Sequence, residues 1–180
     1  MTDNFLKIRA TLITYFIADF SQVMVQEVSA NLKRKGRVSE HIVIDLDKLP
    51  KEKQDKIVFI FAYTLLFNAQ RFLWENIIQD EKYGLKFESF LYKEFSTTYH
   101  TNPLLHVNDY LYYIKRIGAS GEIQYIGSKI CDTINIKDAF LMMDIVHTYS
   151  ALLSNNFYKR LNDLWNMSDK EIEKFYDEFK

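Results

Sequence analysis

The stretch IVFIFAYTLLF, residues 57–67, indicates the fold class of this chain. Its side chains are apolar or aromatic on every side of a helix, with Thr64 as the one polar exception. The run is about eleven residues long, whereas a helix that spans a bilayer needs roughly twenty apolar residues. We therefore interpret it as part of a buried core helix and not as a membrane span. Pro50, a residue type favoured at the first helical position, marks the expected start of this helix.

The composition of the whole chain agrees with long helices. The 180 residues include five glycines and two prolines, and a β-rich fold with many tight turns would need more of both. A chain of this length forms one domain with a large core, and a hydrophobic fraction of 48% is far from that of disordered chains. We predict a single all-α domain over residues 1–180, a bundle of six or seven helices.

Hydrophobic periodicity and helix-end signals locate the expected helices. They cover residues 3–35, 50–82, 87–97, 103–117, 126–133 and 137–164, and the last helix begins near residue 168. Ser168 and Glu171 form a capping box before that last helix, and Met167 can pack against Ile172 as a hydrophobic staple. The final helix is therefore expected to dock onto the bundle.

The first two helices are expected to be amphipathic. In the helix of residues 3–35, the inward stripe includes Ile13, Phe16, Phe20 and Val23, and the polar side includes Thr11, Thr14 and Ser29. In the helix of residues 50–82, a polar stripe leads to the surface through Thr64, Asn68, Arg71, Glu75 and Gln79.

One short extended segment is expected near residues 41–46, where apolar and polar residues alternate. A strand needs a partner for its backbone hydrogen bonds, and EIQYIG, which begins at Glu122, is the candidate.

The helix from Pro103 carries more aromatic residues than one buried face requires. Its apolar stripe consists of Leu104, Val107, Leu111 and Ile114, and the opposite side carries His106, Asp109, Tyr110, Tyr113 and Arg116. Tyrosine and arginine are enriched in the energetic centres of protein interfaces. We predict a protein interface formed by Tyr110, Tyr113, Lys115 and Arg116. Two alternatives are stacking of single-stranded bases on the tyrosines and burial of the tyrosines under another helix of the same chain.

A metal centre in the interior of a helical bundle would use carboxylates and an acidic-x-x-His pair. Asp144 and His147 have this spacing, with Asp19, Glu75, His106 and Asp109 as further candidate ligands. The helical phase places Asp144 and His147 opposite the apolar stripe of their helix, so we expect the pair to face water. A metal-dependent helical-bundle enzyme is thus an alternative hypothesis.

Other catalytic signals are absent from the sequence. It has no nucleophile elbow, P-loop or dinucleotide-binding fingerprint. Cys131, the single cysteine, lies on an expected helix without a nearby histidine and is interpreted as a buried structural residue. We predict no cofactor and favour a non-catalytic function.

The densest basic run is LKRKGR, with Lys33, Arg34, Lys35 and Arg37. Such a run can contact phosphates weakly, but cations also favour the C-terminal end of a helix because of the helix dipole. The net charge of −1 provides no general attraction for nucleic acid. Nucleic-acid binding by this run is therefore the second alternative hypothesis.

The favoured hypothesis is a helical protein-interaction or regulatory module. We expect a partner protein or self-association, including a homodimer, and no membrane binding. The lone cysteine fits a reducing compartment, so a cytoplasmic location is expected.

Overall fold

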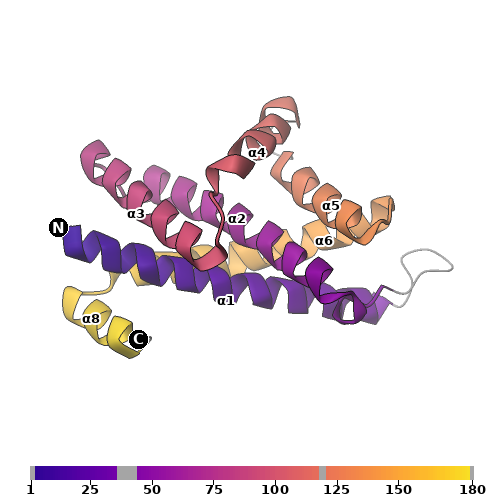
Figure 1. Cartoon of the computed structure of the whole chain (residues 1–180), viewed down its shortest axis with the longest axis horizontal. Coiled ribbons are helices and arrows are strands. Elements are labelled where there is room, and N and C mark those ends of the chain that lie inside the picture. The colour runs from indigo at the N-terminus through magenta and orange to yellow at the C-terminus, as the bar shows by residue number, and fades with distance from the viewer. Residues whose placement is uncertain (1–2, 36–43, 118–120, 179–180) are drawn as a thin grey trace.

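The computed structural model describes residues 3–35, 44–117 and 121–178, and the regular elements in these ranges are all helical (Figure 1). They are α1 (Asp3–Lys35), the 3-10 helix η1 (Leu46–Lys48), α2 (Lys51–Asn76), α3 (Glu81–Tyr99), α4 (Leu104–Ile117), α5 (Gly121–Ile134), α6 (Ala139–Leu152), the π-helix η3 (Leu153–Phe157), α7 (Tyr158–Asn166) and α8 (Asp169–Glu178). Because α6, η3 and α7 are continuous, the described residues form seven helices besides the short 3-10 helix η1. The predicted all-α bundle is confirmed.

The centre of the bundle is formed by α1 and α2. The longest helix, α1, packs against α2, α3, α6, α7 and α8, and α2 also packs against α5. In Figure 1, α4 and α5 lie on one side of these two central helices, and α8 lies on the other side. The outer helices α3, α5, α6, α7 and α8 thereby pack directly against a central helix, whereas α4 packs mainly against α5.

The polar side predicted for α1 is wrong at Thr11, Thr14 and Ser29, which are buried, whereas Lys7, Gln22, Gln26 and Lys33 on the same side are exposed. The Thr14 hydroxyl donates to the carbonyl oxygen of Ala10 at 2.9 Å, four residues earlier on the same helix. A hydroxyl that is satisfied within its own helix can be buried at little cost, since no donor is left unpaired. The inward stripe predicted for α1 is wrong at Val23, which is 40% exposed.

α2 is the core helix predicted from residues 57–67, and its residues 61–69 are all buried. The predicted surface stripe is wrong at its first two positions, since Thr64 and Asn68 are buried. The helix is also shorter than predicted and ends at Asn76. The side chain of Asp80 accepts hydrogen bonds from the backbone nitrogens of Lys82 and Tyr83 and so caps a new helix, α3.

The segment near residues 41–46 contains no strand in its described part, residues 44–46. Leu46 instead begins η1, and Asp45 caps this turn by accepting from the backbone nitrogen of Asp47. The predicted partner around Glu122 is wrong as well, because those residues belong to α5. Residues 41–43 lie outside the described residues.

Two helical stretches, Asp3–Lys33 and Lys51–Asn76, are long and apolar enough to cross a bilayer. Of their most apolar windows, 61% and 67% are buried within the bundle. Core helices of soluble proteins have the same length and composition, so these two properties are weak evidence for a membrane location.

The last helix begins as predicted. The backbone nitrogen of Ser168 donates to Oε2 of Glu171 at 2.8 Å, and the backbone nitrogen of Glu171 donates to Oγ of Ser168 at 3.4 Å. This reciprocal pair is the predicted capping box. Ile172 is buried in a small cluster with Ile8 and Leu12 of α1, against which Met167 also packs, so the predicted docking of α8 is confirmed.

Candidate interaction groove

The floor of an apolar groove is built from three phenylalanine rings. Phe16 stacks on Phe157 with ring centroids 5.2 Å apart and planes inclined by 16°. Phe20 contacts both, at centroid distances of 5.5 Å from Phe16 and 5.3 Å from Phe157. Phe157 is fully buried, whereas Phe16 is half-buried and reaches the groove. The packed rings give the groove a rigid aromatic base.

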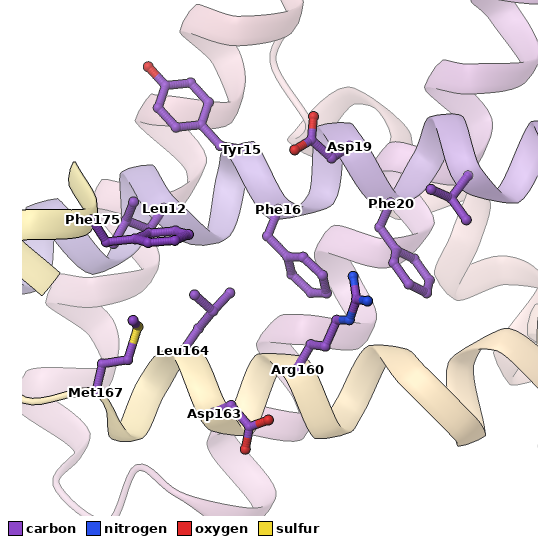
Figure 2. A pocket seen from close by; sticks show the side chains of 11 residues that line it. Leu12, Tyr15, Phe16, Asp19, Phe20, Arg160, Asp163, Leu164, Met167 and Phe175 are labelled. Carbon is purple, nitrogen blue, oxygen red and sulfur yellow. The ribbon is translucent and has the colours of Figure 1, made fainter. Parts of the chain in front are cut away.

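The groove lies between α1, α7 and the start of α8 and has a cavity volume of about 390 Å³. In Figure 2, Phe16, Leu164 and Arg160 point into the space between the two helices. Tyr15, Asp19 and Asp163 also line the groove, and in the same view their side chains point away from the space between the two helices. The full lining is Leu12, Tyr15, Phe16, Asp19, Phe20, Val23, Arg160, Asp163, Leu164, Met167 and Phe175.

The π-helix η3 determines which side chains of α7 meet the groove. A π-helical turn inserts a residue into the helical ladder and changes the phase of the residues that follow. Phe157 packs beneath the groove, while its neighbour Tyr158 stacks on Phe72 of α2, with centroids 5.0 Å apart. Two consecutive residues, the last of η3 and the first of α7, thus both pack against other helices.

One end of the groove is closed by the turn between α7 and α8. Arg9, 5% exposed, donates from Nε to the carbonyl oxygen of Trp165 at 3.3 Å and from Nη2 to that of Met167 at 3.1 Å. Its guanidinium also lies 5.8 Å from the centroid of the Trp165 ring and pairs with Asp169 at 3.6 Å. These contacts hold Met167 and Phe175 at the end of the groove.

The chemistry of the groove is that of a binding surface. Its charged side chains, Asp19, Arg160 and Asp163, are all exposed. Exposed charges beside apolar walls contribute orientation and selectivity to binding, while the aromatic floor offers area for burial. Exposed Tyr15 and Val23 extend this apolar surface to the rim.

The predicted tyrosine surface on α4 requires a correction. Tyr110 is 5% exposed, and its ring packs against Phe67 and Tyr125 at centroid distances of 4.9 and 5.7 Å. The alternative, burial under other helices of the chain, is therefore correct for Tyr110. Lys115 is exposed, and the side chains of Tyr113 and Arg116 lie outside the described residues.

The apolar stripe predicted for α4 is wrong at two positions, whereas Val107 packs against the core as predicted. Leu104 and Leu111 are exposed, together with Leu105 and Tyr112. The predicted orientation of α4 is wrong at these positions for a physical reason. The helix buries the larger aromatic ring of Tyr110 among the rings of α2 and α5, and the leucines therefore face outward. The described exposed residues of α4 are therefore mostly apolar, with Asn108 and Lys115 as the polar ones.

The residues proposed for a metal centre do not converge. Within residues 3–35, 44–117 and 121–178, no group of three or more His, Cys, Asp or Glu side chains could hold a metal ion. His147 is exposed, Asp19 lies in the groove, and Glu75 is exposed on α2. His106 stacks on Tyr63, and the side chain of Asp109 is among those not described.

The described part of the basic run has a structural role. Lys33 pairs with Asp45 at 3.0 Å and also with Asp47. Hydrogen bonds that Lys33 donates to these two carboxylates raise its pKa, and its ammonium in turn lowers the pKa of Asp45. The pairs join the last turns of α1 to η1. The side chains of Arg34 and Lys35, and the whole of Arg37, lie outside the described residues.

Cys131 is buried as predicted, and burial raises the pKa of its thiol. A thiol with a raised pKa is a poor nucleophile at neutral pH.

The groove was missed by sequence reasoning because its floor residues Phe16 and Phe20 were assigned to the core. The bulky apolar residues from Leu12 to Val23 cover more of the helix circumference than one buried stripe requires, and this excess could have indicated the groove.

No protein-family model matches this chain, and comparisons with curated proteins and with solved structures find no significant similarity.

Proposed function

We propose that this chain is a helical protein-interaction module that binds an amphipathic helix of a partner in the groove between α1 and α7. The observation that carries the proposal is the row of apolar and aromatic side chains on α1, from Leu12 through Phe16 and Phe20 to Val23, in which the two phenylalanines pack on the buried ring of Phe157. Concave surfaces with accessible aromatic anchors are typical of protein recognition sites.

The dimensions of the groove favour a helix as the bound segment. Residues 12 to 23 of α1 extend over about 16 Å, or three helical turns. A partner helix with apolar residues at i, i+3 or i+4, and i+7 would present anchors over the same length. The chain already uses this mode once, since α8 lays Ile172 against Ile8 and Leu12 on the preceding turns of α1.

The rim charges favour one orientation of the partner. Two carboxylates, Asp19 and Asp163, lie at the edges, and one guanidinium, Arg160, reaches into the groove. A partner helix with lysine or arginine beside its apolar stripe would complement this arrangement, since complementary charges guide association and exclude wrong partners. A second copy of this chain is the other occupant that we consider.

The exposed face of α4 is a second surface for association, because it displays Leu105 at 73% exposure, with Lys115 nearly three turns further along the helix. We rank it below the groove because it presents separate side chains on one helix, whereas the groove combines three helices around a packed floor.

Site-specific photocross-linking in cells tests the proposal. A photoreactive amino acid would replace Val23 in the groove or, as a matched control, the neighbouring exposed Gln22, which does not line it. We expect a discrete adduct from position 23 that is lost when Tyr15→Glu is added and is absent from position 22. The mass of the adduct distinguishes self-association from a different partner. Equal adducts at both positions, or none at position 23, would contradict the proposal.

A further inference from the structure

A second cavity, of about 420 Å³, lies between α2, α4 and α5, away from the groove. Its floor is formed by Tyr63 and Tyr125, which are 3% and 1% exposed and whose hydroxyls hydrogen-bond to each other. The two rings meet edge to face, with centroids 6.0 Å apart. Aromatic rings at the base of a cavity that also has charged and polar lining residues are found in many small-molecule sites.

Aromatic side chains that are more accessible form one wall. The imidazole of His106 lies parallel to the Tyr63 ring, with centroids 5.0 Å apart and an interplanar angle of 12°. Phe59 meets His106 edge to face at 5.1 Å. Both Phe59 and His106 are half-buried and line the cavity, so they offer ring surface to a planar ligand.

Two lysines contribute positive charge to this cavity. Lys129 of α5 lies with its ammonium 5.5 Å from the centroid of the Tyr125 ring, and Lys56 of α2 lines the cavity from an exposed position. One carboxylate, Asp132, also lines it. Among the described residues that line the cavity, two ammonium groups and one carboxylate give a net positive charge, which favours an anionic ligand.

We propose that this cavity binds a small organic anion that carries a planar aromatic ring. The ring would lie against Phe59 and His106, and the anionic group would lie near Lys56 and Lys129. The volume is within the range of small-ligand pockets, roughly 300–1,000 Å³, and accommodates one such ring with its substituent. The site goes beyond the protein-interaction function, because no residue that lines this cavity also lines the groove.

Ligand-observed NMR with two matched probes tests the assignment. Phenyl phosphate carries the aromatic ring and the negative charge, whereas benzyl alcohol carries the ring without charge. The intact chain would be compared with the double variant Lys56→Gln/Lys129→Gln. The matched control is Lys51→Gln/Lys53→Gln, which removes two positive charges from α2 without changing the lining of the cavity. Tyr15→Glu serves as a control for binding in the groove.

We expect phenyl phosphate to bind the intact chain at millimolar concentration. The Lys56→Gln/Lys129→Gln variant should weaken this binding roughly tenfold or more, since each charge-assisted contact is lost. The Lys51→Gln/Lys53→Gln and Tyr15→Glu variants should bind as the intact chain does, and benzyl alcohol should bind more weakly than phenyl phosphate throughout. Equal binding of the two probes, equal weakening by both lysine pairs, or absence of phenyl phosphate binding would each overturn the proposal.

Discussion

Tyr158, the first residue of α7, donates its hydroxyl hydrogen to Oδ1 of Asn68 in the middle of α2, at 2.9 Å. Asn68 also donates from Nδ2 to the hydroxyl of Tyr149 at 2.9 Å and accepts from Nη2 of Arg71 at 3.1 Å. One buried amide therefore links α2, α6 and α7. The π-helix that places Phe157 beneath the groove also places Tyr158 in this polar cluster.

Asn68→Leu is expected to destabilise the chain by about 2–4 kcal/mol, because it removes the hydrogen bonds of this buried amide with the buried Tyr149 hydroxyl and the half-buried Tyr158 hydroxyl. Urea unfolding followed by circular dichroism measures this change in the free energy of unfolding. The matched control is Asn76→Leu, the same substitution at an exposed position of the same helix, which should change stability by less than about 0.5 kcal/mol. Equal effects of the two variants would show that the cluster does not stabilise the fold.

The capping box of α8 makes a pH-dependent prediction. Hydrogen bonds from Ser168 hold the pKa of Glu171 below its ordinary value of 4.5. Because the folded pKa is lowered, the contribution of this carboxylate to stability is present above pH 4.5 and is lost as the pH falls through the folded pKa. An NMR titration of the Glu171 carboxyl carbon should give a midpoint below 4.5 that moves back toward 4.5 in Ser168→Ala. An unchanged midpoint would show that Ser168 is not the cause.

Gly127 permits the close approach of α5 and α6. A Cβ atom at this position would lie 2.3 Å from Cγ of Met142 and 3.3 Å from its backbone oxygen. Gly127→Ala is therefore expected to destabilise the chain by about 1 kcal/mol, the remainder after the better helix propensity of alanine offsets part of the overpacking.

A double-mutant cycle distinguishes this clash from other effects of alanine. In a Met142→Ala background the nearest contact is removed, and Gly127→Ala should become neutral or stabilising by thermal unfolding. The same loss of stability in both backgrounds would contradict the role of Met142.

The sequence allowed the helical class and the last helix to be predicted because both depend on local signals. The Ser168 and Glu171 pair lies within one helical turn. The run of apolar residues around Phe61 indicates a helix that is buried on all sides at that point. The boundary between α2 and α3 depends on Asp80, whose capping role is visible in sequence only after one decides that the helix ends there.

The candidate groove depends on long-range packing, which a single sequence does not reveal. Buried Thr14 and exposed Val23 reverse the simple rule that polar residues face water, because the hydroxyl of Thr14 is satisfied within its own helix. Burial of Tyr110 similarly depends on Phe67 and Tyr125, which lie on other helices. The charged rim of the groove combines Asp19 with Arg160 and Asp163 from the distant α7.

The attachment of α8 depends on a buried guanidinium. Burial lowers the pKa of Arg9, while the nearby carboxylate of Asp169 opposes this shift. The guanidinium is bound by the carbonyl oxygens of Trp165 and Met167, so it joins α1 to the turn that precedes α8. A methionine in place of Arg9 would have a similar length and would retain part of the packing, but it could not donate these hydrogen bonds.

Arg9→Met is expected to detach α8 locally and to cost about 2 kcal/mol, since hydrogen bonds from a charged donor are worth roughly 1.5–3 kcal/mol. Hydrogen exchange should become at least about tenfold faster for the amides of α8, while those of residues 60–66 in α2 stay protected. Lys7→Met, at an exposed position of the same helix, is the control and should leave α8 protected. Because Met167 and Phe175 line one end of the groove, cross-linking from position 23 should also weaken in Arg9→Met. Unchanged protection of α8 would contradict the anchoring role of Arg9, and equal loss of protection throughout the chain would show that Arg9 stabilises the whole bundle.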